Sequence, residues 1–221
     1  ARIHSPHPVY IGDSSDTADA QRLKKAAEEM RGSFQITYRH YPSSEYNYAQ
    51  CVKSLIKLVE EPYIVFSGDD DFQVPNTLTQ CAQFLDKNPE YATVHGRALT
   101  FQIFESGAYG HLKSVGSYFQ GEIDKDAAAA RLLQYLEHYF VLIFSVHRTV
   151  DTVYNWSMMD RLNEHTFAAE LFPFCLSSIQ GKSKMLSSLS LVRQLHDARH
   201  KLPDMFDWIT SPNWAPAYQM F

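Results

Sequence analysis

The chain has 221 residues, a formal net charge of −5 and a pI near 6.0. This length suits one domain with one core, and hydrophobic residues make up 45% of it. The negative charge disfavours nucleic acid as a partner, and no apolar run approaches the roughly 20 residues that a membrane-spanning helix needs. With a mean hydropathy of −0.31, the composition predicts a globular protein that is not transmembrane.

The cysteines are odd in number, far apart and embedded in apolar helical patterns. They are Cys51, Cys81 and Cys175. Packing in the core of a protein from a reduced compartment explains them best, with a disulfide or a metal site as the alternative.

Short apolar segments alternate with helical patterns in the first half of the chain. We expect strands at 9–11, 34–38 and 63–66, with helices at 17–31 and 46–60 between them. This order is typical of a doubly wound α/β protein, so the predicted fold is a Rossmann-like, mostly parallel sheet flanked by helices.

The second half continues the alternation. A helix is expected to begin at Pro75 and end at Asn88, followed by an extended segment at 91–104 and a loop region with several glycines to 121. A helix capped by Asp124 or Asp126 then runs to Glu137, and a strand follows at 139–146. The last expected elements are a helix from 158 to 181 and a strand at 185–192.

Three consecutive carboxylates, Asp69, Asp70 and Asp71, directly follow the apolar run at 63–66. Adjacent like charges repel one another unless a cation lies among them, and ligands of open α/β sheets bind at this end of a strand. Carboxylate oxygens suit Mg2+ or Mn2+ rather than zinc, because no Cys or His pair is spaced as zinc ligands nearby. The alternative is a solvated turn that caps the next helix.

The segments Ile11-Gly-Asp-Ser-Ser15, Pro62-Tyr-Ile-Val-Phe-Ser-Gly-Asp-Asp-Asp-Phe72 and Asn88-Pro89 together resemble the family-2-like nucleotide-sugar glycosyltransferases with the GT-A fold. The resemblance covers about residues 9 to 200. It implies metal-dependent transfer of a sugar, with inversion, from a nucleotide diphosphate sugar to a hydroxyl of a glycan, lipid or other acceptor, as in bacterial polysaccharide biosynthesis. It also implies a cytoplasmic location, with peripheral contact to the inner face of a membrane as an open possibility.

The resemblance assigns roles around the donor. Asp13 and Asp69 would contact the nucleotide, Asp70 would hold the turn, and Asp71 would bind the metal. Alternate residues of an extended turn project the same way, so Asp69 and Asp71 can face one ligand.

The later part of the chain supplies the remaining implied roles. Glu170 would be the general base that deprotonates the acceptor, with Glu164 and Asp160 as alternates one helical turn away. A basic residue, Arg193, would bind the diphosphate, and His196 or His200 would complete the metal site.

Members of this family carry one more strand and helix ahead of the element that contains Asp13, whereas eight residues precede Val9 here. We expect either an N-terminally incomplete chain or a differently built sheet, with exposed strand edges that favour a homodimer. The predicted layout is a single domain with a nucleotide-sugar half at 1–95, an acceptor and catalytic half at 96–200 and a tail at 201–221.

Two other functions remain open at this point. One is a catalytically impaired glycosyltransferase-like module that binds a nucleotide or glycan without turnover. The other is a metal-dependent phosphatase with an aspartyl nucleophile, although Phe72-Gln73-Val74 lacks the threonine that such a site usually has close to its aspartates.

Overall fold

The computed structural model describes residues 5–105, 110–161 and 166–196, together with the isolated positions 210–212, 215 and 219. Helices labelled α are α-helices and those labelled η are 3-10 helices. In chain order the elements are β1 (Val9–Asp13), α1 (Thr17–Met30), β2 (Ile36–His40), α2 (Tyr48–Ile56), β3 (Tyr63–Ile64), β4 (Asp71–Gln73), α3 (Pro75–Lys87), β5 (Tyr91–Ile103), β6 (Leu112–Tyr118), α4 (Ala128–Glu137), η1 (Leu142–Phe144), β7 (Val146–Arg148), α5 (Thr149–Ser157), η2 (Met158–Arg161), α6 (Thr166–Gln180) and β8 (Lys182–Gln194).

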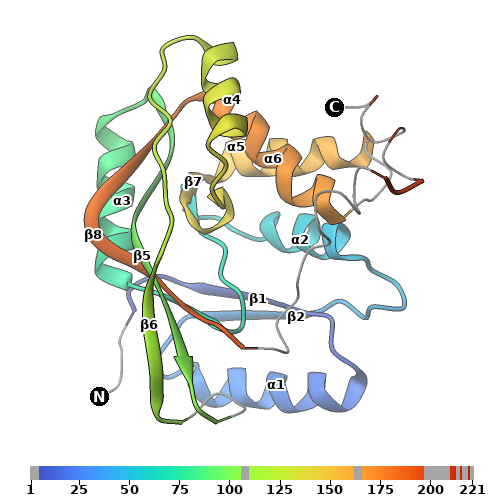
Figure 1. Ribbon diagram of the computed structural model, residues 1–221. Helices are drawn as coiled ribbons and strands as arrows, with labels where there is room; N and C mark the ends of the chain where they lie inside the picture. The colour runs from blue at the N-terminus through green and yellow to red at the C-terminus, as the bar shows by residue number, and fades with distance from the viewer. Residues whose placement is uncertain are drawn as a thin grey trace.

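β1 and β2 form a parallel two-stranded sheet of their own. α1 connects them, and its first turn is capped by the Asp16 carboxylate, which accepts the backbone N–H groups of Ala18 and Asp19. Figure 1 shows α1 along one side of this pair and α2 on the other side. The β1–α1–β2 unit is therefore a layer that pairs with no other strand of the described chain.

The other six strands form one sheet in the order β3-β7-β5-β8-β4, with β6 also paired to β5. The two long strands β5 and β8 are parallel, and every other pair in this sheet is antiparallel. At their crossing the Gly96 N–H donates to Ser190 Oγ at 2.9 Å, and a Cβ on Gly96 would collide with the backbone oxygen of Ser188. Only glycine fits at this point.

Helices cover both faces of the six-stranded sheet (Figure 1), with α3 on one face and α4, α5 and α6 on the other. Cys81 and Leu85 of α3 pack on Val94 of β5 and Val146 of β7. On the opposite face, the main apolar side chains are Ile123, Tyr135, Phe140, Leu142, Phe174 and Cys175. A third cluster joins α2 to α5 and η2 through Val52, Ile56, Trp156 and Met159.

The structure confirms the α/β class, the helices at α1, α2, α3 and α4, and the long strands β5 and β8. The start of α3 at Pro75 and its end at Asn88 are also confirmed. All three cysteines are free and buried, as expected. Within the described residues, no helix has the length and apolarity needed to cross a bilayer.

Several details differ from the expectation. Neither Asp124 nor Asp126 caps α4, whose N-cap residue is Ala127, and the helix expected from 158 begins only at Thr166, after α5 and η2. Antiparallel pairs outnumber parallel ones, and β3 is only two residues long, half-buried and at one end of the strand order rather than inside a parallel sheet. The run at 139–146 is not a strand, because it forms η1 and only then enters β7. The glycine-rich region contains β6, which the sequence did not reveal because all of its side chains but the last are exposed.

Candidate donor-binding site

The acidic turn links β3 to β4 and is held by the pairing of β4 with β8. Asp71 is the first residue of β4, and its register partner in β8 is Arg193. Within the turn, the Asp71 N–H donates to the Gly68 oxygen at 3.4 Å, and the Ser67 hydroxyl donates to the Asp71 oxygen at 3.3 Å. The strand pairing therefore brings a carboxylate and a guanidinium together across 122 residues of sequence.

Asp71 and Arg193 form a buried ion pair. Arg193 Nε donates to Asp71 Oδ1 at 2.9 Å, and the side chains are 1% exposed for Asp71 and 20% exposed for Arg193. Burial raises the pKa of the Asp71 carboxyl, and the Arg193 guanidinium offsets only part of that rise. For Arg193 the balance is opposite: burial lowers its pKa, but Tyr118 and Asp71 outweigh it and the pKa is raised.

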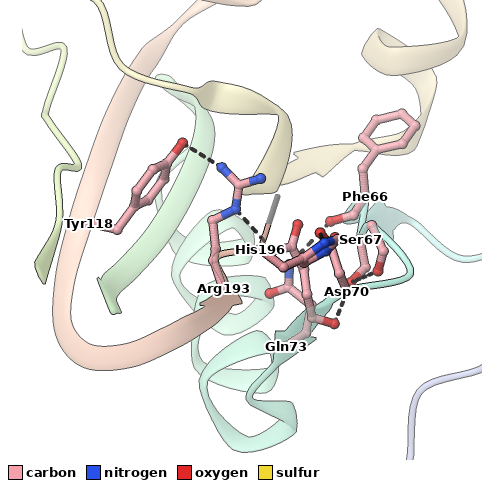
Figure 2. A network of polar contacts seen from close by, with 9 residues as sticks. Phe66, Ser67, Asp70, Gln73, Tyr118, Arg193 and His196 are labelled. Atoms are coloured by element: carbon pink, nitrogen blue, oxygen red, sulfur yellow. Dashed lines mark hydrogen bonds and ion pairs between the residues drawn. The ribbon is translucent and has the colours of Figure 1, made fainter. Parts of the chain in front are cut away.

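Two aromatic side chains enclose the guanidinium of Arg193. Arg193 Nη1 donates to the Tyr118 hydroxyl at 2.9 Å. The Arg193 Cζ atom also lies 4.9 Å from the ring centroid of Tyr118 and 4.5 Å from that of Phe144. Figure 2 shows Arg193 between Tyr118 on one side and the acidic turn on the other.

Asp70 connects the same turn to the residues that follow β8. Its Oδ2 lies 3.0 Å from Nε2 of His196, and its backbone oxygen accepts the Gln194 N–H at 3.3 Å. Figure 2 shows His196 next to Asp70 in this arrangement. Asp69 is exposed at the tip of the turn.

Each of these two carboxylates has a second oxygen outside its ion pair, Oδ1 of Asp70 and Oδ2 of Asp71, and both oxygens lie beside Gly68. A Cβ added to Gly68 would lie 2.8 Å from Asp70 Oδ1 and 3.0 Å from Asp71 Oδ2. Because Gly68 has no side chain, both carboxylate oxygens can lie close to its backbone. Oxygen donors of this kind fit a hard divalent cation such as Mg2+ or Mn2+.

Asp13 lies at the end of β1, in the separate two-stranded sheet. It is 5% exposed, and its carboxylate accepts the Tyr38 hydroxyl at 2.6 Å and the Ser15 N–H at 2.9 Å. Burial raises the pKa of Asp13, but the hydrogen bonds from Tyr38 and Ser15, together with the nearby His40, outweigh burial and hold the pKa below its usual value. In the described part of the chain, no hydrogen bond or ion pair joins Asp13 to the acidic turn.

Comparison with solved structures identifies the architecture. The chain resembles residues 1–349 of TarS from S. aureus in complex with UDP-GlcNAc, with a TM-score of 0.55 and 18% identity over 87% of this chain and 51% of that one. The complex of the same protein with UDP gives a TM-score of 0.52 and 16% identity, over 85% of this chain and 51% of that one. The chain has a GT-A-like fold.

The GT-A-like chain spans about half the length of these TarS structures, and 31% of a longer TarS structure. No protein-family model matches the sequence. No curated protein matches it significantly either. The likeness to TarS thus concerns the fold alone.

Of the predicted site residues, the structure brings together Asp70, Asp71, Arg193 and His196. Glu170 lies on α6, but its side chain is outside the described part, as is that of the alternate Asp160 on η2. The alternate Glu164 and the predicted ligand His200 lie outside the described residues altogether.

No cluster of three or more His, Cys, Asp or Glu side chains able to hold a metal occurs among the residues that the structure describes. Asp70 and Asp71 together bring two carboxylate oxygens close to Gly68, and oxygens of this kind can act as metal ligands.

Sequence reasoning missed the two aromatic neighbours of Arg193. Tyr118 is 75 residues away in sequence and reaches Arg193 through the pairing of β6 with β5 and of β5 with β8. Phe144 reaches it from η1. No local motif marks either residue, so only the strand arrangement could have revealed them.

Proposed function

We propose that this chain is a metal-dependent, inverting glycosyltransferase that moves a sugar from a nucleotide diphosphate sugar to an acceptor hydroxyl. The observation that carries the proposal is the acidic turn of a GT-A-like fold, whose Asp71 lies against Arg193 at 2.9 Å with its second carboxylate oxygen beside Gly68. One similar structure, TarS, is a glycosyltransferase in complex with UDP-GlcNAc, which supports a nucleotide-sugar donor.

In this proposal the donor lies across the turn. Asp13 and the exposed Asp69 bind the nucleotide, Asp70 holds the turn, and Arg193 binds the diphosphate. A planar guanidinium with several N–H donors suits phosphate oxygens better than an ammonium does.

Asp71, with His196 or His200, would hold Mg2+ or Mn2+ next to the diphosphate. When bound, such an ion takes up charge that develops on the leaving diphosphate. Asp71 Oδ2 and Asp70 Oδ1 are the two oxygens that the ion pairs leave for it.

Glu170 is the proposed general base. Its carboxylate takes the proton of the acceptor hydroxyl while that oxygen bonds to the anomeric carbon from the face opposite the leaving group. The bond between the anomeric carbon and the diphosphate oxygen breaks, and the nucleoside diphosphate leaves. A transition state with oxocarbenium character follows from this geometry, as in glycoside hydrolysis.

Substitution of Asp71 tests the proposal. Asp71→Asn keeps the size of the side chain and removes its charge, so metal-dependent turnover of UDP-GlcNAc should fall about 100-fold or more, since about 2.7 kcal/mol of charge stabilisation is lost. The assay is release of UDP in the presence of Mn2+. Asp19→Asn, which alters an exposed carboxylate on α1 paired with Arg22, is the matched control and should retain full turnover.

Full metal-dependent turnover by Asp71→Asn would exclude this assignment. Binding of UDP-GlcNAc by calorimetry, without UDP release by the wild-type chain, would instead identify a non-catalytic binding module. Release of phosphate from simple phosphate esters would identify a phosphatase.

A further inference from the structure

We propose that Tyr118 and Phe144 are positioning residues that fix the plane of the Arg193 guanidinium, so that its unused N–H groups are presented to a diphosphate. This inference rests on the proposed function, because it assigns the anion that the guanidinium receives. Neither residue need touch the donor, since both act through Arg193.

Three contacts hold the guanidinium from different directions. Asp71 Oδ1 accepts from Nε at 2.9 Å, and the Tyr118 hydroxyl accepts from Nη1 at 2.9 Å. The rings of Tyr118 and Phe144 lie 4.9 Å and 4.5 Å from Cζ, within the range of cation–π attraction. A guanidinium bonded at both Nε and Nη1 and packed against two rings has little freedom to rotate.

The donors that remain are suited to a phosphate group. Arginine carries N–H groups at Nε, Nη1 and Nη2, and the hydrogen bonds to described residues use Nε and one N–H of Nη1. One N–H of Nη1 and both of Nη2 are left, and adjacent N–H groups of a guanidinium can bind two oxygens of one phosphate. The side chain is 20% exposed, so part of it faces solvent.

The packing of Tyr118 and Phe144 around the Arg193 guanidinium should make donor binding more favourable. A free arginine side chain loses about 2 kcal/mol of rotamer entropy when it is fixed by a ligand. Where Tyr118 and Phe144 have already restricted it, less of this cost falls on donor binding. The two residues come from β6 and η1, so the position of the guanidinium depends on elements outside the acidic turn.

The test is calorimetric titration of the full chain with UDP and Mn2+. Tyr118→Phe removes one hydroxyl, and Phe144→Leu removes one ring. Each should raise the Kd of UDP about 3- to 10-fold, the range expected for a lost charge-assisted hydrogen bond or cation–π contact at a partly exposed site. The matched controls are Tyr154→Phe and Phe104→Leu, on exposed side chains of α5 and the end of the β5–β6 hairpin, which should leave Kd unchanged.

A double-variant cycle separates positioning from general structural support. If Tyr118 acts through Arg193, Tyr118→Phe should hardly change the Kd of UDP further in an Arg193→Lys background. The reason is that lysine has no planar guanidinium for Tyr118 to orient. The same fold-change in both backgrounds would overturn the proposal. So would unchanged UDP affinity in both Tyr118→Phe and Phe144→Leu.

The failure of this inference can be told apart from failure of the proposed function. If the wild-type chain binds no UDP, both fall together. If the wild-type chain binds UDP and the two variants bind it equally well, the positioning role fails and the proposed function stands. Thermal unfolding of each variant ensures that a weakened affinity is not loss of the folded state.

Discussion

Two histidines are buried side by side in the centre of the sheet. His95 on β5 and His147 on β7 are 2% and 3% exposed. His95 shares a hydrogen bond with Ser145 Oγ at 3.0 Å, and His147 shares one with the Leu142 oxygen at 2.9 Å. Burial lowers the pKa of each imidazole to about 4. The Gly121 backbone and Glu122 oppose the shift at His95, and the Leu142 oxygen opposes it at His147.

The buried histidines predict loss of stability in mild acid. Between pH 6.5 and about 4 the unfolded chain binds protons at His95 and His147 that the folded chain does not, so the free energy of unfolding falls as the pH falls. Each histidine contributes at most about 1.4 kcal/mol per pH unit. Urea unfolding at pH 7, 6 and 5 measures the slope.

Variants assign this slope to its source. His95→Gln and His147→Gln should each flatten the dependence on pH, even if they lower stability at pH 7. His138→Gln alters an exposed histidine after α4 and should not flatten it. A slope that remains unchanged in both buried variants would contradict the prediction.

At the scale of elements, Arg131 links α4 to the end of α6 by hydrogen bonds, in addition to the apolar cluster that the two helices share. Arg131 is 8% exposed and donates to the backbone oxygens of Ser178 and Ile179 in the last turn of α6 at 2.9 and 2.6 Å. It also donates to the oxygens of Lys125 and Asp126, just before α4. These oxygens include helix-end carbonyls that have no partner within their own helix.

Replacement of Arg131 should loosen both helices. Arg131→Met keeps much of the packing volume but leaves these buried oxygens without their donor, so we expect a loss of roughly 3 kcal/mol in the free energy of unfolding. Chemical denaturation measures it. Lys125→Met, on an exposed side chain next to the same oxygens, should change stability by less than about 0.5 kcal/mol. Equal effects of the two variants would remove the special role of Arg131.

The elements also show what the sequence could and could not predict. Helical spacing was enough for α1 to α4, because those helices have one apolar face. The expected cap of α4 was wrong, because Ala127 precedes this helix and no side chain caps it. β6 gave no signal, since its exposed face leaves no alternation to detect. The apolar run at 139–146 was misread because Phe140 and Leu142 are buried in a loop and a 3-10 helix rather than in a strand.

The same limit applies to the candidate site. The acidic turn and Arg193 stand out locally by charge, whereas the pairing of Asp71 with Arg193 depends on the β4–β8 register. The contact of Asp70 with His196 follows from the same pairing, and no helix places that histidine. Local charge thus predicted which residues matter, but not which partners they have.

At the scale of the whole molecule, the described residues form two separate sheets, and no strand pairing joins one sheet to the other. The Tyr10 hydroxyl donates to Glu61 at 2.9 Å, and Gly12 packs against Cys51 and Leu55 of α2. The strand pairs within β1–β2 do not continue into the six-stranded sheet. The predicted homodimer remains a prediction that light scattering can test.

This division predicts unequal protection from hydrogen exchange. Amides of β1 and β2 depend on one strand pair and on α1, most of which is exposed, so this unit should open without unfolding the centre of β5 and β8. Native-state exchange followed by mass spectrometry should show residues 9–40 exchanging faster than residues 91–98. Equal protection of the two regions would mean that the sheets unfold together.

The contact of Gly96 with β8 restricts how the sequence can drift over generations. Every single-base change at a glycine codon that alters the residue adds a Cβ or ends the chain, and here a Cβ would meet the backbone of Ser188, which cannot move aside as a flexible side chain can. Compensation would need a shifted strand and therefore several simultaneous changes. β8 also carries Arg193. A shift of this strand, caused by a mutation at position 96, would therefore disturb the candidate site as well.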